Sequence, residues 1–164
     1  MSLEGPAGTL LNPEQADNFE DIEKQFAVKA VQQMMTYWGI LEKARGSNLR
    51  LTKIDDEIYE HFKKEFPDWD PTATINEDDM KSPKGKERWR NFVNEYEKKV
   101  DDFNFGTMLR NNPKAEYSEE DTIFAVRMQF YAIEIQRNRE GLNDWIYEKN
   151  HPEEANQPEA AKKD

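Results

Sequence analysis

The stretch FAVRMQFYAIEIQRNR, residues 124–139, decides the fold that the sequence predicts. On a helix with about 100° between successive residues, apolar side chains cover both of its flanks. These apolar positions are Ile123, Phe124, Val126, Met128, Phe130, Tyr131, Ile133 and Ile135. Between the flanks lie Arg127, Glu134 and Asn138. A helix that is apolar nearly all round is normally central in its fold, so we expect this row of polar groups to lie inside the core.

Two members of the row carry charges that need partners. Arg127 and Glu134 are separated by about 10 Å along the helix axis, from a rise of about 1.5 Å per residue, which is too far for a direct ion pair. Because a buried charge is costly unless it is paired, we expect each to pair with a group on another helix or loop. Four acids are candidates for Arg127: Asp55, Asp56, Asp101 and Asp102. The alternative is that the row belongs to a recognition surface.

The composition indicates one domain with solvated ends. The chain has 164 residues, which is the size of a single domain. Charged residues make up 35% of it, but 4 Trp, 6 Tyr and 9 Phe suffice to anchor a compact core. We therefore expect a helical domain over residues 18–147, preceded by a flexible segment, 1–17, and followed by a disordered acidic tail, 148–164.

The charge and the missing cysteines narrow the possible partners. A formal net charge of −11 disfavours direct DNA binding and anionic membranes. The absence of cysteine excludes disulfides and thiol nucleophiles, and is compatible with a reducing compartment. No apolar run approaches the roughly 20 residues that cross a bilayer. We expect a cytoplasmic protein with no membrane partner.

Helical periodicity recurs along the chain, whereas strand signals are weak. Ser82 before Pro83 is a typical helix start, and Gly106 and Pro113 interrupt the pattern. Between the second and third helices, one helical turn is expected near Asp78. The four main helices run from Asn18 to about Arg45, from Thr52 to Pro67, from Ser82 to about Phe103, and from Ser118 to about Tyr147. The predicted fold class is all-α: a single-domain bundle of four main helices with a bent joint near Gly106.

The first helix carries an apolar set at helical spacing, which we expect to be its core stripe. Its members are Phe19, Ile22, Phe26, Val28, Val31, Met35, Trp38 and Leu41.

Motifs for catalysis are missing. The chain has no G-x-S-x-G elbow, no complete phosphate-binding loop and no G-x-G-x-x-G turn. Acids crowd the second helix around His61, but the repeated Glu-x-x-His of a di-iron bundle is absent, so we interpret them as a solvated face. We expect no catalytic residue, no metal, no cofactor and no enzymatic activity.

A basic cluster opens the third helix. It consists of Lys81, Lys84, Lys86, Arg88 and Arg90. Positive charge at a helix start opposes the macrodipole by about 0.3–1 kcal/mol per group. Such a choice favours a docking role toward the ribosome or an acidic partner. The alternative is a solvated helix start whose charges are offset by nearby acids.

Two further places are candidate partner-binding sites. The joint around Gly106 alternates aromatic and polar residues, which is typical of a recognition surface with aromatic anchors. The alternative is a packed turn in which Gly106 adopts a positive φ and Phe105 fills the core. The end of the last helix leaves the core and can meet a partner. The candidate residues are Phe103, Asn104, Phe105 and Arg110 in the joint, and Arg137, Arg139, Glu140 and Asn143 at the helix end.

Three segments carry a resemblance to a known family. They are LRLTKIDDEIYEHF (49–62), KERWRNFVNEYEKKVDDFNFGTMLR (86–110) and YSEEDTIFAVRMQFYAIEIQRNREGLND (117–144). Together they resemble the family of polysaccharide biosynthesis domain-containing protein 1. The segment ADNFEDIEKQFAV (16–28) brings the chain nearest to fungal members. The likeness extends from about Phe19 to Tyr147.

The resemblance implies a small helical cytosolic protein and a function unrelated to the family's label. Members are understood as dedicated chaperones that engage nascent translation elongation factor 1-alpha at the ribosome and shield its GTP-binding domain while it folds. This implies a non-enzymatic, ATP-independent chaperone. One alternative is an enzyme of polysaccharide biosynthesis, similar to a glycan methyltransferase, as the label suggests. Another is a generic helical interaction scaffold.

Overall fold

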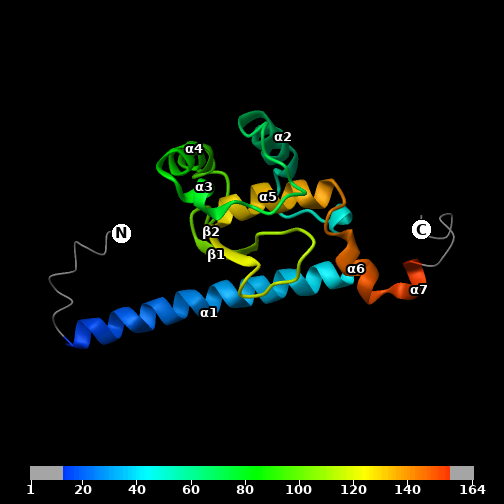
Figure 1. Cartoon of the computed structure of the whole chain (residues 1–164). Coiled ribbons are helices and arrows are strands. Elements are labelled where there is room, and N and C mark those ends of the chain that lie inside the picture. The colour runs from blue at the N-terminus through cyan, green and yellow to red at the C-terminus, as the bar shows by residue number, and fades with distance from the viewer. Residues whose placement is uncertain (1–12, 156–164) are drawn as a thin grey trace.

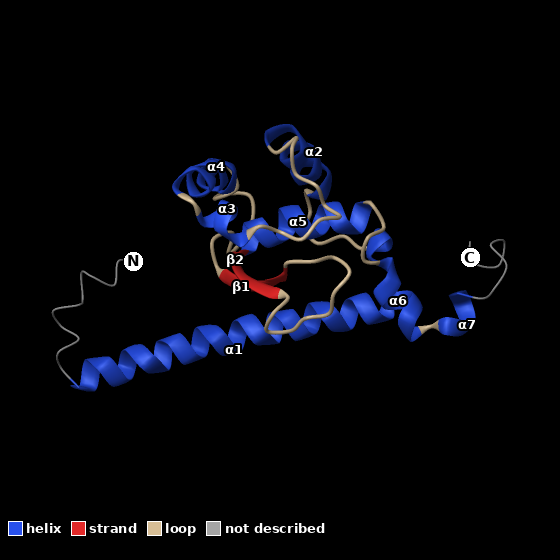
Figure 2. Cartoon of the chain, viewed as in Figure 1, coloured by secondary structure: helices blue, strands red, loops and turns tan. Residues whose placement is uncertain are grey.

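The computed structural model describes residues 13–155, with side chains for 27–154, and shows helices packed around a two-stranded sheet (Figures 1 and 2). In the view of Figure 1, α1 lies on one side of the sheet and α2, α3 and α4 lie on the other, with α5 beside the sheet. The elements in chain order are α1 (Pro13–Lys43), the 3-10 turn η2 (Gly46–Asn48), α2 (Asp55–Glu65), α3 (Glu77–Lys81), α4 (Pro83–Asn94), β1 (Gly106–Arg110), β2 (Thr122–Val126), α5 (Arg127–Arg139), α6 (Asp144–Asn150) and α7 (Pro152–Ala155).

The predicted all-α class is wrong, because β1 and β2 form an antiparallel hairpin. Gly106 lies opposite Val126, and the register continues to Arg110 opposite Thr122. In β2, burial alternates: Ile123 and Ala125 are buried, and Phe124 between them is 56% exposed. This period of two is that of a strand rather than a helix. The fold is therefore α+β, and the joint near Gly106 is the start of β1.

The long last helix of the prediction is a strand, two helices and a turn. α5 begins at Arg127, where the chain leaves β2. The N–H groups of Arg127 and Met128 donate to the carbonyls of Phe105 and Phe103, each at 2.7 Å. These bonds satisfy two of the free donors at the helix start. At the other end Gly141, with φ 76°, turns the chain toward α6.

α1 is confirmed as a long helix, and its C-terminal half packs against β1 and α6. Tyr37 and Leu41 are buried there. Figure 1 shows its N-terminal part extending past the other elements.

Aromatic side chains pack α2 against α4. The ring centroids of Phe66 and Trp89 are 4.3 Å apart, and Phe62 and Phe92 join the same cluster. Ser82 caps α4 as predicted, since its Oγ accepts the N–H of Gly85 at 3.1 Å. The helical turn near Asp78 is confirmed as α3.

Three local predictions differ from the structure. α4 ends at Asn94, about two turns before the predicted end, and non-helical turns follow. Thr52 does not cap α2; instead the Asp55 carboxylate accepts the N–H groups of Leu51 and Thr52. In the joint, the residue with positive φ is Asp102, at 56°, rather than Gly106.

Both predicted end segments fall partly outside the described residues. Of the segment 1–17, residues 13–17 belong to α1 and 1–12 lie outside. Of the segment 148–164, the first eight residues include the end of α6 and all of α7, and 156–164 lie outside. Within residues 13–155, no helix combines the length and the apolar character that crossing a membrane requires.

Candidate functional site

A buried cluster of polar side chains is centred on Glu134 of α5. Its Oε2 lies 2.7 Å from Nη1 of Arg137 and 3.6 Å from Nη2 of Arg110. Its Oε1 accepts hydrogen bonds from the Tyr37 hydroxyl and from Nδ2 of Asn143, both at 2.8 Å. The two arginines and Glu134 are at most 1% exposed. The cluster therefore neutralises Glu134 inside the core, as a buried ion requires.

Asparagines extend the cluster to the rest of the domain. Asn138 donates to the Tyr37 hydroxyl at 3.1 Å and accepts from Asn143 at 2.7 Å. Arg110 donates to Oδ1 of Asn143 at 2.5 Å and to the carbonyls of Pro113 and Ala115. α1, β1, α5 and the turn before α6 are thus joined through one network. We interpret it as the element that fixes their relative positions.

The electrostatics of the cluster favour its charged form. Burial raises the pKa of the Glu134 carboxyl, but the charges of Arg110 and Arg137, with hydrogen bonds from Tyr37 and Arg137, lower that pKa below its usual value. Burial, followed by the charge of Glu134, raises the pKa of Tyr37 well above its usual value. Tyr37 therefore acts as a hydrogen-bond donor and Glu134 as an anion at neutral pH.

The polar row predicted on α5 is buried in part. Glu134 and Asn138 are in the core, and Glu134 has partners on other elements, as expected. Arg127 is only partly buried, and its Nε has no hydrogen-bond partner in the part of the chain that the structure describes. None of the four expected acids pairs with it there; Asp56 pairs with Arg139 instead, at 2.6 Å.

The predicted partner-binding residues divide into two groups. Arg110, Arg137 and Asn143 belong to the buried cluster, so a partner cannot reach them without opening the core. The others lie nearer the surface: Asn104, Arg139 and Glu140 are exposed, and Phe103 and Phe105 are partly buried. The structure therefore does not bring the eight residues together on one surface.

The basic cluster at the start of α4 is exposed throughout. Lys81 pairs with Glu77 at 2.7 Å, and Arg88 pairs with Asp68 at 2.6 Å. Three members have no ion pair among the residues that the structure describes: Lys84, Lys86 and Arg90. Part of the cluster is thus already neutralised, and the rest is free to meet an anionic group.

An exposed apolar face on α1 was missed by the sequence prediction. Val28, Val31 and Met35 are 53%, 40% and 64% exposed, although they were assigned to the core stripe. We call these three residues the outer face of α1. A cavity of about 290 Å³ adjoins this face at Met35 and is also lined by Trp38 and Tyr117. The signal in the sequence is that α1 is apolar on two sides, whereas the fold buries only the side that holds Ala30, Tyr37 and Leu41.

No group of three or more potential metal-binding side chains occurs among the described residues. His61, which lies beside several acids in the sequence, stacks on Phe92 with ring centroids 4.5 Å apart. Its Nδ1 is 2.8 Å from the hydroxyl of Tyr96, and its Nε2 is 3.3 Å from Glu95.

The fold and these surfaces define a small α+β domain with a polar cluster closed to solvent and an apolar helix face open to it. Residues 22–148 match the family described as PBDC1 protein. The chain belongs to the PBDC1 family, and the resemblance stated from its sequence segments is confirmed.

Relatives in yeasts and in human support this assignment. The chain is 55% identical over 138 residues to the PBDC1 homolog of Saccharomyces cerevisiae, covering 82% of this chain and 94% of that protein. It is 58% identical over 141 residues to the homolog of Schizosaccharomyces pombe, covering 84% and 96%. Identity to human PBDC1 is 42% over 137 residues, covering 84% of this chain and 58% of the human protein.

A solved structure has the same fold. The solution NMR structure of protein yst0336 from Saccharomyces cerevisiae superposes with a TM-score of 0.74 at 55% identity. The superposition covers 83% of this chain and 95% of the yeast chain.

Proposed function

We propose that this protein is a non-enzymatic, ATP-independent chaperone that shields the GTP-binding domain of nascent translation elongation factor 1-alpha at the ribosome in the cytoplasm. The proposal extends family membership with the role that the family resemblance implies. The observation that carries it in the structure is the outer face of α1. A chaperone of this kind must present apolar surface to a client without unfolding itself.

The outer face of α1 meets that requirement. Val28, Val31 and Met35 follow the spacing i, i+3, i+7, so they line one side of the helix. All three side chains are exposed to solvent, and an exposed apolar patch normally marks a site of interaction. The buried contacts of Tyr37 hold the C-terminal half of α1 in the core. The outer face of α1 is thus attached to the folded core of the domain.

Shielding follows from ordinary hydrophobic association. An incompletely folded GTP-binding domain exposes apolar side chains that its native core later buries. Contact with the outer face removes apolar surface from water on both sides, which is worth roughly 25 cal/mol per Å². The net charge of −11 on this chain disfavours its own self-association. Release then requires only that the client bury its own apolar groups, and no nucleotide is consumed.

A pull-down from a translation extract, with and without puromycin, tests the proposal. We expect the protein to recover elongation factor 1-alpha, and puromycin to abolish the recovery because it releases nascent chains. Changing the outer face with Val28→Ser, Val31→Ser and Met35→Ser should lower the recovery at least tenfold.

Ile40→Ser is the matched control. Ile40 is an exposed apolar residue of the same helix, at 42%, but it points about 150° away from the outer face. Equal loss in both variants, or recovery that does not depend on translation, contradicts the proposal. A rise in Tm on adding S-adenosylmethionine or a sugar nucleotide would indicate an enzyme instead.

A further inference from the structure

The outer edge of β2 is an open strand edge. Arg127 N–H donates to Phe105 at 2.7 Å, and Asn111 N–H donates to Asp121 at 2.8 Å, at the two ends of the hairpin register. In an antiparallel pair, opposed residues alternate between bonded and non-bonded pairs. Phe124, opposite Met108, therefore belongs to a non-bonded pair. Its N–H and C=O point away from β1.

This outward edge is unpaired where it could accept another strand. Over residues 13–155, the main chain of Phe124 has no hydrogen-bond partner on its outward side. Two residues further along, the outward N–H of Val126 is taken by Oε1 of Gln129, at 2.9 Å. An open edge presents a ready template for pairing with another chain.

A groove of about 410 Å³ runs between this edge and α4. Phe124, Ala125 and Val126 all line it, although successive side chains of a strand point to opposite faces. The groove therefore follows the strand edge rather than one face of the sheet. Gln129, which bonds the outward N–H of Val126, also lines it. We call this cavity the β2 groove.

The β2 groove is apolar at its floor and basic at its rim. Phe124 is 56% exposed, and Trp89 and Val93 of α4 lie across from the strand. Three cations line it, of which Lys86 and Arg90 have no ion pair among the described residues; the third is Lys81. Among the described residues no carboxylate lines it, in a chain with 34 acids. Its charge is therefore opposite to that of the chain as a whole.

We propose that the β2 groove binds an extended acidic segment of a partner protein, which adds a third strand to the hairpin. The N–H and C=O of Phe124 would pair with the main chain of the segment. Carboxylates of the segment would bind Lys86 and Arg90, and an apolar side chain would pack on the Phe124 ring. Main-chain pairing supplies the affinity in this mode of recognition, and the side-chain contacts supply the specificity.

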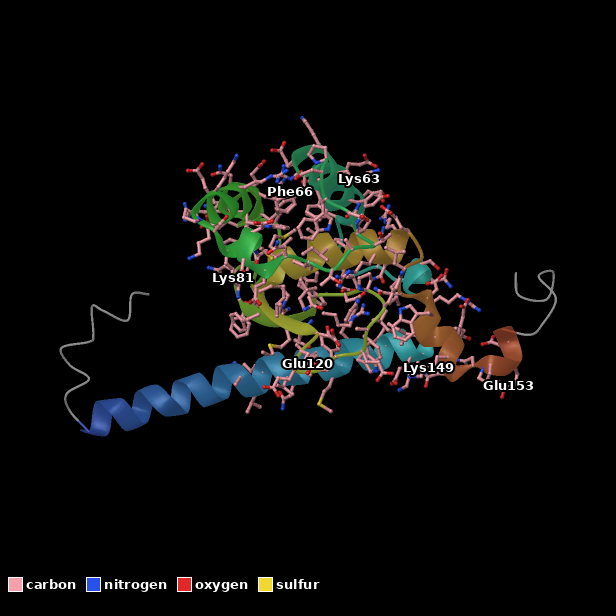
Figure 3. The ribbon with its side chains drawn as sticks, viewed as in Figure 1. Lys63, Phe66, Lys81, Glu120, Lys149 and Glu153 are labelled. Atoms are coloured by element: carbon pink, nitrogen blue, oxygen red, sulfur yellow. The ribbon has the colours of Figure 1, made fainter. Side chains whose placement is uncertain are left out.

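This site is separate from the outer face of α1. In the view of Figure 3, Lys81 at the end of α3 and the ribbon of α1 lie on opposite sides of the hairpin. The inference goes beyond the proposed chaperone function and does not depend on it.

The test uses the full chain and a fluorescent nine-residue peptide of alternating Glu and Val. Anisotropy should show saturable binding of this peptide, and its Lys-Val counterpart should not bind. Hydrogen exchange of the Phe124 amide, followed by NMR, should be fast in the free protein and slowed by the acidic peptide. The Phe124 amide reports strand pairing itself, so it separates the proposal from a loose charge attraction.

Charge reversal supplies the matched variants. Lys86→Glu with Arg90→Glu should weaken peptide binding at least tenfold. Lys53→Glu with Lys98→Glu makes the same change in net charge at two exposed lysines outside both the groove and the basic cluster, and should weaken it less than twofold. Equal effects of the two pairs overturn the proposal, because they indicate non-specific attraction.

Other occupants of the groove give distinct results, and each of them overturns the proposal. Slow exchange at Phe124 in the free monomer means that a segment of this chain fills the edge. Slow exchange that appears only with dimerisation in sedimentation means that a second copy does. A single-stranded RNA that shifts the Phe124 amide when the peptide does not identifies a nucleic-acid site. Variants of the α1 outer face should leave peptide binding unchanged, so this test and the pull-down can fail separately.

Discussion

The hydroxyl of Tyr37 donates a hydrogen bond to the carboxylate of Glu134 at 2.8 Å, joining residues 97 positions apart in the sequence. Both side chains are buried. The bond connects the helix that carries the exposed apolar face to the central helix α5. Because Glu134 is also held by two arginines, the position of α1 depends on a charged network rather than on apolar packing alone.

Tyr37→Phe removes this connection and keeps the ring. We expect the free energy of unfolding to fall by about 1.5–3 kcal/mol, since the lost bond is made to a charged group. Urea denaturation measures the change. Tyr131→Phe is the control, because the Tyr131 hydroxyl has no hydrogen-bond partner within the described part of the chain. Equal losses in the two variants would mean that the Tyr37–Glu134 bond does not stabilise the fold.

Acid should destabilise the protein through Glu134. The usual pKa of glutamate in an unfolded chain is about 4.3, and the pKa of folded Glu134 is lower. Its contribution to stability is therefore complete above that pH and is lost as the pH falls through the folded pKa. We expect the unfolding free energy of the native protein to fall steeply below about pH 4.3.

Glu134→Gln tests the same group at neutral pH. It leaves Arg110 and Arg137 buried without a counter-charge, which should cost about 3–5 kcal/mol. The unfolding free energy of the variant should also fall less steeply below about pH 4.3, which is the usual pKa of a glutamate. Glu120→Gln is the control, since Glu120 is exposed and has no ion pair among the described residues. An acid limb of unchanged steepness in Glu134→Gln would assign that limb to other carboxylates.

The N-cap of α4 can be weighed by Ser82→Ala. The Ser82 Oγ accepts the Gly85 N–H and donates to the carbonyl of Asp79 at 2.8 Å, so it joins α3 to α4. We expect a loss of about 0.5–2 kcal/mol in unfolding free energy. Thr74→Ala, in an exposed loop position whose side chain makes no hydrogen bond to the described residues, should change it by less than about 0.5 kcal/mol. A null result for Ser82 would show that water replaces the cap without loss.

Local sequence signals predicted the first helices well, the last helix only in part and the hairpin not at all. α1, α2, α3 and the start of α4 carry periodicity or caps that are readable within one turn. The strand β2 was not predicted because its apolar residues continue the two apolar flanks of α5. A single helical pattern therefore covers both elements. β1 has only five residues, and its pairing partner is set by a loop that Arg110 holds through the carbonyls of Pro113 and Ala115.

The site was predicted unevenly for a related reason. The exposure of the basic cluster follows from a local run of lysines and arginines. Arg110, Arg137 and Asn143 are buried because they surround Glu134. Glu134 is held in turn by Tyr37, which lies 97 positions away in the sequence. The outer face of α1 is apolar like any core stripe. The outer face of α1 differs from a core stripe only because no other described element of the fold packs against it.

Two glycines near the end of α1 should respond to alanine in opposite directions. A Cβ at Gly39, inside the helix, would meet nothing within 4 Å. Gly39→Ala should therefore raise the unfolding free energy by about 0.5–1 kcal/mol, because alanine restricts the unfolded chain and favours the helix. Calorimetric Tm measurements on both variants give the comparison.

Gly46 is the opposite case, because it is buried against the polar cluster. A Cβ there would overlap Oδ1 of Asn138 and lie 3.1 Å from Cβ of Asn143. To remove this overlap, the Asn138 amide, which donates to the Tyr37 hydroxyl, would have to move. The added methyl group therefore disturbs the same network that holds α1. We expect Gly46→Ala to lower the unfolding free energy by about 1–3 kcal/mol. A Tm at or above that of the native protein would mean that the cluster can shift freely, and that it does not fix α1 as we infer.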